Sequence, residues 1–175
     1  ISVGGLDDAG NPHLGKISAY RGSHGPTIDG LQKPEIITLA DWLAAPILPG
    51  TPTAEQAMLI TKLSHTPDDR LAAEIAANAG VFPALDEARD RPAYLVRAII
   101  AATMRDGLVI DGHYKMVDGT SFAAPIVTSV VAQMLEVNPS LNPLQIKRIL
   151  LQTAKRLPNV AVDRQGWGAV QPRDA

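Results

Sequence analysis

Ser121 occupies the part of this chain that is best suited to chemistry. It lies in the sequence Gly-Thr-Ser-Phe-Ala-Ala-Pro at residues 119–125, directly before a long apolar stretch of helix-forming residues. The serine is therefore expected at the start of a helix. A hydroxyl there can cap the helix by accepting a hydrogen bond from a free backbone N–H. Alternatively, it can attack a substrate while the first-turn N–H groups stabilise developing negative charge.

The neighbours of Ser121 favour the nucleophile over the cap. Gly119 allows a sharp turn and lets a substrate chain approach closely, because it has no Cβ. Ala123 and Ala124 keep the first helical turn thin, so that another element can pack beneath the serine. Pro125 is expected in the first turn, where its missing N–H has no helical partner to lose.

The whole string resembles the active-site motif Gly-Thr-Ser-x-Ala-x-Pro of the subtilisin-like serine peptidases, the subtilases of peptidase S8 type. Three further segments resemble parts of the same catalytic domain and follow in the family's order. They are the strand after the oxyanion region (residues 1–7), the segment S-x-x-G-P-x-x-D-G-x-x-K-P-D/E-I (residues 18–37) and the closing Gly-x-Gly turn (residues 165–170). The resemblance thus covers residues 1–50 and 114–172, but not residues 51–113.

The resemblance implies a role for each residue of the serine turn. Ser121 would be the nucleophile that forms an acyl-enzyme with the carbonyl carbon of a protein or peptide substrate. Its backbone N–H would be one oxyanion donor, while Gly119 and Thr120 would shape the turn. One segment departs from the family, because residues 37–41 read Ile-Thr-Leu-Ala-Asp where subtilases usually have Ile-x-Ala-Pro-Gly.

A serine nucleophile also needs a base and a carboxylate that orients the base. The family's motifs for these groups, Asp-[Ser/Thr]-Gly and His-Gly-[Thr/Ser], are absent from the 175 residues. The histidines are His13, His24, His65 and His113, and all four are expected in solvated loops. His113 is close to Ser121 in sequence, but its position matches the approach to the strand before the serine turn, so no local dyad is expected.

The chain is therefore expected to be a fragment, the C-terminal part of a subtilase catalytic domain (residues 1–175). The missing N-terminal part would supply the Asp, the His and an oxyanion Asn, and the fragment alone would be inactive. An alternative is a non-catalytic interaction module on the truncated fold, with Ser121 only a cap and a helical insertion as its binding surface. An α/β-hydrolase is disfavoured, because Ala123 stands where the elbow pattern Gly-x-Ser-x-Gly needs glycine.

Composition narrows the class of protein further. The chain is 46% hydrophobic and 19% charged with a net charge of −2, which argues against disorder and against nucleic acid as a partner. It has no cysteine, and no apolar run is expected to be long enough to span a bilayer. No metal ligands or cofactor are identified, and calcium is implied by the resemblance alone. Composition leaves the compartment open, and the resemblance implies a secreted or periplasmic protein.

The expected fold is α/β: a subtilisin-like, mostly parallel sheet flanked by helices, with its N-terminal half missing. Residues 51–113 are expected to form a helical insertion on the surface near the primed side of the substrate cleft, where it would gate access or recognise large substrates. Its charged groups at residues 86–91 are expected on a solvated face. Expected strands are 1–6, 15–20, 33–38, 42–48, 108–110 and 114–117; expected helices begin at Thr53, Asp68, Arg91, Ser121 and Leu144.

Overall fold

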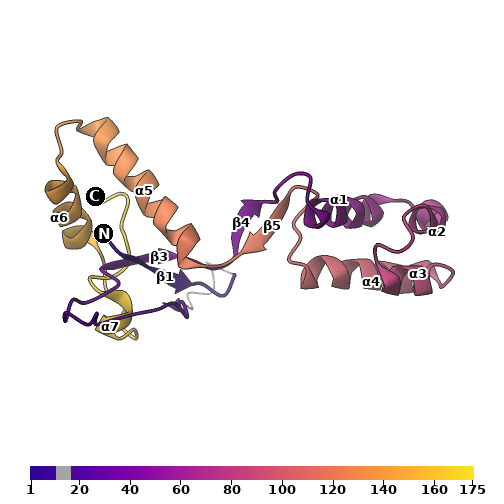
Figure 1. The fold of residues 1–175 in the computed structure, drawn as a ribbon, viewed down its shortest axis with the longest axis horizontal. Coiled ribbons are helices and arrows are strands. Elements are labelled where there is room, and N and C mark those ends of the chain that lie inside the picture. Colours follow the sequence, from indigo (N-terminus) through magenta and orange to yellow (C-terminus); the bar gives the residue numbers. More distant parts are fainter. Residues whose placement is uncertain (11–16) are drawn as a thin grey trace. The chain divides into compact units, whose positions relative to one another are not determined.

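The computed structural model describes residues 1–10 and 17–175 and divides the chain into two compact units (Figure 1). Unit 1 consists of Ile1–Leu43 and Asp118–Ala175, and unit 2 of Ala44–Val117. The chain contains both strands and helices, which confirms the α/β class. The expected insertion, residues 51–113, falls within unit 2.

Unit 1 contains a three-stranded sheet with the strand order β2-β1-β3. Strand β1 (Val3–Asp7) runs parallel to β3 (Ile36–Leu39) and antiparallel to the short β2 (Ser18–Ala19). The strand glycines allow tight packing, because a Cβ at Gly5 would lie 2.5 Å from the Cβ of Ala40. The strand expected at 15–20 is shorter in the structure, where β2 comprises Ser18–Ala19 alone. Residues 15 and 16 lie outside the described residues.

Helices α5 (Thr120–Val137) and α6 (Pro143–Thr153) build the core of unit 1 with the sheet, and α5 contacts both β1 and β3. Asn142 starts α6 with a capping box: its side chain accepts from the N–H of Gln145 at 3.0 Å, and the Gln145 side chain accepts from the N–H of Asn142 at 2.9 Å. The buried core residues are Ile36, Val127, Val130, Met134, Ile146, Leu150 and Val170.

The closing Gly-x-Gly turn, which follows the short helix α7 (Val162–Gln165), packs against β3. The N–H of Trp167 donates to the Glu35 carbonyl at 2.9 Å, and the N–H of Ile37 donates to the Gly168 carbonyl at 3.0 Å. Gly166 has φ 58°, and a Cβ there would overlap the Pro34 carbonyl oxygen. Glycine is therefore required at this position for both space and backbone conformation.

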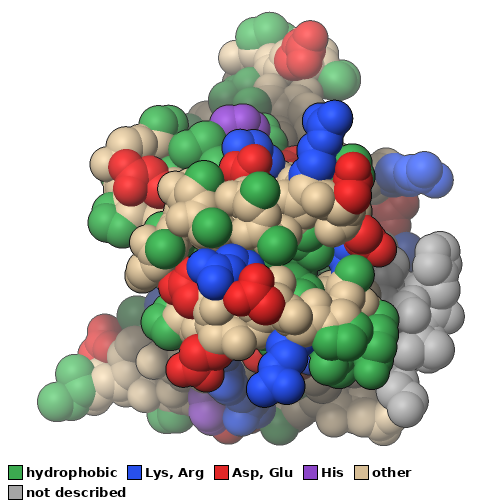
Figure 2. All heavy atoms as spheres, turned by 90° about the vertical axis from the view of Figure 1, so that its right-hand side faces the viewer, with side chains coloured by type: hydrophobic (Ala, Val, Ile, Leu, Met, Phe, Trp, Pro, Cys, Tyr) green, Lys and Arg blue, Asp and Glu red, His purple; other side chains and the backbone are tan. Residues whose placement is uncertain are grey.

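Unit 2 is a helical unit that adjoins a two-stranded sheet of β4 (Leu43–Pro46) and β5 (Tyr114–Val117). Four helices lie between these strands: α1 (Pro52–His65), α2 (Asp68–Ala77), α3 (Pro83–Ala88) and α4 (Ala93–Asp106). They enclose a core of their own, composed of Ile60, Leu63, Leu71, Ile75, Leu85, Val96 and Ile100. Charged side chains of both signs are interspersed on the face that Figure 2 shows.

Arg97 of α4 closes the C-terminal end of α1. Its Nη1 donates to the carbonyls of Leu63 at 3.1 Å and Ser64 at 3.0 Å, and its Nε donates to Asp68 at 2.9 Å. These carbonyls belong to the last turn of α1, which has no helical donors of its own. A cation at this end also complements the helix dipole.

Several expected boundaries in unit 2 were wrong. Thr51, not Thr53, caps α1 through a bond from the N–H of Ala54 at 3.2 Å. Helix α4 begins at Ala93 rather than Arg91, and α3 was not expected at all. Residues 108–110 form no strand, because the backbone turns at Leu108 (φ 55°) and leaves only a bridge between Val109 and Lys115.

Candidate nucleophile site

Ser121 is the second residue of α5, and it is exposed. The N-cap is Gly119, whose φ of 137° and ψ of 149° suit glycine alone. Within residues 1–10 and 17–175, neither the hydroxyl nor the backbone N–H of Ser121 has a hydrogen-bond partner. The cap position therefore belongs to Gly119, and Ser121 presents a free hydroxyl and a free N–H at the positive end of an 18-residue helix.

Pro125 lies deeper in the helix than expected. Helix α5 begins at Thr120, so Pro125 is inside it, in the second turn rather than the first. An ordinary residue at this position would donate its N–H to the carbonyl of Ser121, four residues earlier. Proline has no N–H, so the Ser121 carbonyl lacks that helical bond.

The sheet holds the serine turn from one side. The N–H of Gly119 donates to the carbonyl of Ala40 at 2.6 Å, directly after β3. Ala40 is fully buried, and its own N–H donates to the carbonyl of Leu6 in β1 at 2.9 Å. The segment that departs from the family pattern thus anchors the turn through the main chain of Ala40.

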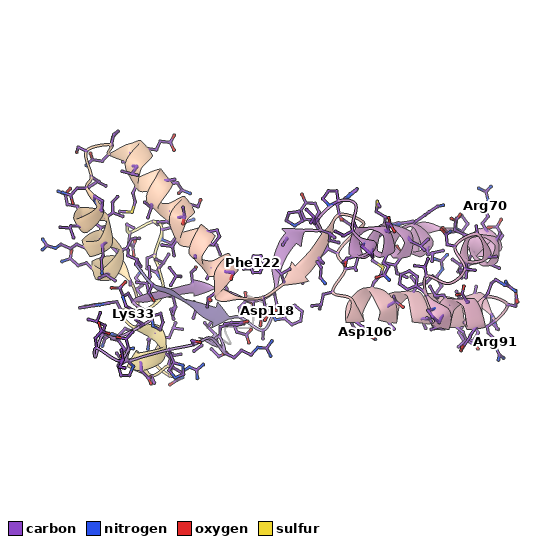
Figure 3. The ribbon with its side chains drawn as sticks, in the orientation of Figure 1. Lys33, Arg70, Arg91, Asp106, Asp118 and Phe122 are labelled. Atoms are coloured by element: carbon purple, nitrogen blue, oxygen red, sulfur yellow. The ribbon has the colours of Figure 1, made fainter. Side chains whose placement is uncertain are left out.

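Asp118 holds the turn from the other side. Its carboxylate accepts a hydrogen bond from the Tyr20 hydroxyl at 2.6 Å and one from the Arg21 guanidinium at 3.2 Å. The hydrogen bond from Tyr20, followed by the one from Arg21, lowers the pKa of Asp118 below its usual range. The bond between Tyr20 and Asp118 also raises the pKa of Tyr20. Figure 3 shows Asp118 just before α5, the helix that carries Phe122.

His24, the described histidine in the same unit as Ser121, does not bond to Ser121, and His65 and His113 belong to the other unit. His24 lies in an exposed loop with Nε2 4.0 Å from a carboxylate oxygen of Asp163, and His113 lies in an exposed bend before β5. His65 is the last residue of α1, not a loop residue as expected, and its Nδ1 is 2.9 Å from the Thr61 carbonyl. His13 lies outside the described residues.

No group of three His, Cys, Asp or Glu side chains arranged to hold a metal ion occurs in the part of the chain that the structure describes. A calcium site stays an expectation from the resemblance.

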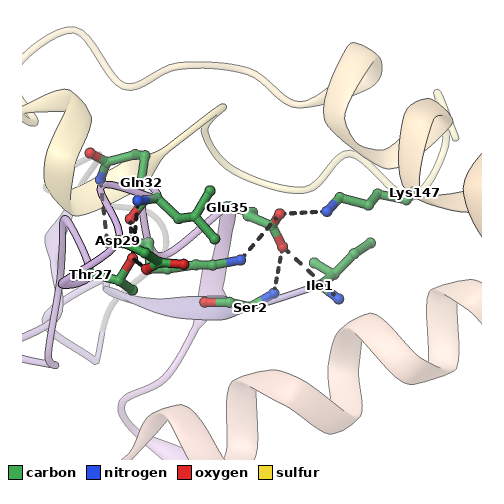
Figure 4. A network of polar contacts seen from close by, with 9 residues as sticks. Ile1, Ser2, Thr27, Asp29, Gln32, Glu35 and Lys147 are labelled. Carbon is green, nitrogen blue, oxygen red and sulfur yellow. Dashed lines mark hydrogen bonds and ion pairs between the residues drawn. The ribbon is translucent and has the colours of Figure 1, made fainter.

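Glu35 forms a polar network that the sequence did not reveal (Figure 4). One carboxylate oxygen accepts from Lys147 at 2.6 Å and lies 3.3 Å from Lys33, and the other accepts from the N–H of Ser2 at 2.9 Å. Burial alone would raise the pKa of Glu35, but the bonds from Lys147, Ser2 and Lys33 outweigh burial and lower the pKa to about 2. The network ties Ser2, just before β1, and Glu35, just before β3, to Lys147 of α6.

Comparison with known proteins identifies the family of this chain. The family model described as the subtilase family, Peptidase_S8, matches residues 1–168. Subtilisin-like protease SBT3.9 of Arabidopsis thaliana is 36% identical over 58 residues, which are 33% of this chain and 8% of that protein. Subtilisin-like protease 1 of Plasmodium vivax is 36% identical over 56 residues, 32% of this chain and 9% of that protein. No solved structure matches significantly.

The chain belongs to the subtilase family, because the family model covers nearly all of it. The family is one of serine peptidases, which act on proteins or peptides. The aligned part spans less than a tenth of the length of each of these two relatives.

One expectation about membranes needs correction. Helix α5 is long and apolar enough to cross a bilayer by length and composition, although no apolar run of that length was expected. Core helices of water-soluble proteins pass the same test, so this finding is weak.

Proposed function

We propose that the protein is a serine endopeptidase in which Ser121 is the nucleophile. The observation that carries the proposal is the free hydroxyl of Ser121 beside its own free N–H at the start of α5. The Ser121 oxygen attacks the carbonyl carbon of a peptide bond, and a base takes the hydroxyl proton and returns it to the leaving amine. Water then hydrolyses the acyl-enzyme and restores the serine.

In the oxyanion step, negative charge develops on the former carbonyl oxygen of the substrate. The N–H of Ser121 is available to that oxygen because it has no partner among the described residues. The positive end of α5 adds to this stabilisation. Gly119 and Thr120 set the shape of the turn, which Ala40 and Asp118 hold in place.

We further propose that a segment outside these 175 residues supplies the base, its carboxylate and a side-chain oxyanion donor. Two observations support this: His24, the described histidine in the unit of Ser121, does not bond to Ser121, and the aligned part covers less than a tenth of each relative. The 175-residue chain alone should therefore hydrolyse no peptide bonds, since a serine hydroxyl without a base is a poor nucleophile.

The helical unit is proposed to be an insertion that recognises large substrates or gates access to the cleft. The support is that its helices have a core of their own and lie in sequence between β4 and β5, two strands that pair with each other, so the unit can be inserted without disturbing the other unit's core. The family's character suggests that the protein works outside the cytoplasm, as a secreted or periplasmic enzyme.

A fluorophosphonate probe on the intact protein tests the proposal. It reacts with activated serines, and peptide mapping should place the label on Ser121. Ser129, which is also exposed on α5, provides an internal control because no base is expected to activate it. The non-catalytic alternative predicts no labelling of Ser121, and it has lost one support because Gly119 holds the cap position.

A further inference from the structure

A groove of about 520 Å³ lies in unit 1 between α6 and the closing turn. Its apolar wall contains Leu144 and Leu151 of α6 together with Trp167. None of its lining residues belongs to the serine turn or to the contacts that hold it. The groove is therefore a separate feature that the proposed catalysis does not use.

The apolar part of the groove is unusually accessible. Leu144 is 80% exposed and Trp167 is 54% exposed, while Leu151 is half-buried beneath them. Single exposed apolar residues are ordinary, but a tryptophan and two leucines around one hollow form a patch. Aromatic side chains that become buried on binding dominate the energy of many protein interfaces.

The same region is rich in cations. Residues 137–162 contain Lys147, Arg148, Lys155 and Arg156 but no Asp or Glu, in a chain whose net charge is −2. Lys147 is neutralised by Glu35 at 2.6 Å, and Lys155 pairs with a carboxylate oxygen of Asp174 at 2.8 Å. Arg148 lines the groove and has no ion-pair partner among the described residues.

We propose that this groove binds an acidic peptide segment of a partner protein. An apolar side chain of the peptide packs on Trp167 and Leu144, and a neighbouring carboxylate pairs with the guanidinium of Arg148. Arginine suits this task because its planar fork binds a carboxylate through two parallel hydrogen bonds. The apolar wall favours a peptide over a simple polyanion, because a polyanion would pair with Arg148 but would make no apolar contact with Trp167.

Binding is measured by fluorescence anisotropy on the intact protein with Ser121→Ala, so that the probe is not consumed. The probe is a fluorescein-labelled peptide, Gly-Glu-Glu-Leu-Phe-Glu-Gly, and its twin has Gln in place of each Glu. We expect Arg148→Glu and Trp167→Ala each to weaken binding of the acidic probe by about tenfold or more, and the Gln twin to bind about tenfold more weakly. Arg156→Glu is the matched control, since Arg156 is exposed in the same cationic segment but lies outside the groove.

The controls separate this site from general attraction of anions. Arg156→Glu should leave binding within about twofold. Three results would overturn the peptide site in favour of a polyanion surface. They are an equal loss of affinity for the acidic probe in Arg156→Glu, an unchanged affinity in Trp167→Ala, and binding of a heparin oligosaccharide that depends on Arg148 but not on Trp167. Absence of saturable binding of the acidic probe up to about 1 mM would overturn it outright.

Discussion

Neutralising Glu35 should loosen the contact between β3 and α6. The substitution Glu35→Gln keeps the size of the side chain but removes the charge that Lys147 contacts at 2.6 Å and that the N–H of Ser2 contacts at 2.9 Å. Its effect should depend on pH in a way that identifies the cause, because only the ionised carboxylate of the wild type makes these charge-assisted bonds.

The size of the effect follows from the lowered pKa of Glu35. A fall from 4.5 to about 2 corresponds to at most about 3 kcal/mol of stability at pH 7, because a tenfold change in proton affinity is about 1.4 kcal/mol. Lys147 is 41% exposed, so water screens part of the attraction. We therefore expect Glu35→Gln to lower the free energy of unfolding of unit 1 by about 1–2 kcal/mol at pH 7.

The sign of the pH dependence is fixed. Folding lowers the pKa of Glu35, so its contribution is complete above about pH 4.5 and is lost as the pH falls toward 2. Both lysines stay charged throughout this range. The difference in stability between wild type and Glu35→Gln should thus shrink by about half or more between pH 7 and pH 3.

Hydrogen exchange with mass spectrometry on the intact protein measures this locally, in peptides that cover residues 33–39 and 143–153. Protection there should fall about 5- to 30-fold at pH 7 in Glu35→Gln. Glu136→Gln is the matched control, since Glu136 is an exposed glutamate on α5 without an ion pair among the described residues. A difference that stays constant between pH 7 and pH 3, or an equal effect of Glu136→Gln, would refute the reasoning.

Three further predictions concern the turn, the serine and the helical unit. Gly166→Ala should lower the melting temperature of the intact protein far more than Gly30→Ala. Both glycines have positive φ, but a Cβ at Gly166 would overlap the Pro34 carbonyl oxygen, whereas a Cβ at Gly30 would have no atom within 4 Å. Equal effects would show that the Pro34 carbonyl can move aside. Tyr20→Phe and Asp118→Asn each weaken the bond between Tyr20 and Asp118 that holds the serine turn, so each should slow fluorophosphonate labelling of Ser121 several-fold. The melting temperature should change little, because Asp118 is exposed to solvent. Unchanged labelling would show that Asp118 does not position the turn. Replacing residues 52–112 with a short Gly/Ser linker should leave cleavage of small peptides within about tenfold, roughly 1.4 kcal/mol, while changing selectivity among protein substrates; loss of folding would show that the helical unit belongs to the core.

The features that the sequence predicted well are those with strong local signals. Helix α6 was expected because Asn142 and Pro143 precede apolar residues at helical spacing, Ile146, Ile149 and Leu150. The apolar run after Ser121 likewise predicted the long helix α5, and the resemblance that placed Ser121 in a subtilase agrees with the family match. The role of Ser121 in catalysis remains a prediction.

The misplaced elements have identifiable physical causes. Two threonines lie near the start of α1, Thr51 before it and Thr53 inside it. Thr51 caps the helix, because Pro52 then occupies the first helical turn, where proline is favoured. Helix α3 has only six residues, too few for a periodic apolar pattern to stand out. Residues 108–110 have the composition of a strand, but a positive φ at Leu108 turns the backbone away.

Long-range polar contacts could not be predicted from one sequence. Tyr20 and Asp118 are 98 residues apart, and Glu35 and Lys147 are 112 residues apart. No local pattern marks such pairs, since each side chain alone looks like an ordinary charged or polar loop residue. Yet these pairs hold the serine turn and join the sheet to α6.

The central claim, that Ser121 is the nucleophile, is tested most directly by steady-state hydrolysis of a peptide substrate by the intact protein and its Ser121→Ala variant. Ser129→Ala serves as the control, because it removes a hydroxyl from the same helix without touching the turn. We expect Ser121→Ala to lower kcat by about three orders of magnitude or more, as loss of a serine nucleophile does, and Ser129→Ala to leave it within about twofold. Undiminished turnover by Ser121→Ala would contradict the assignment.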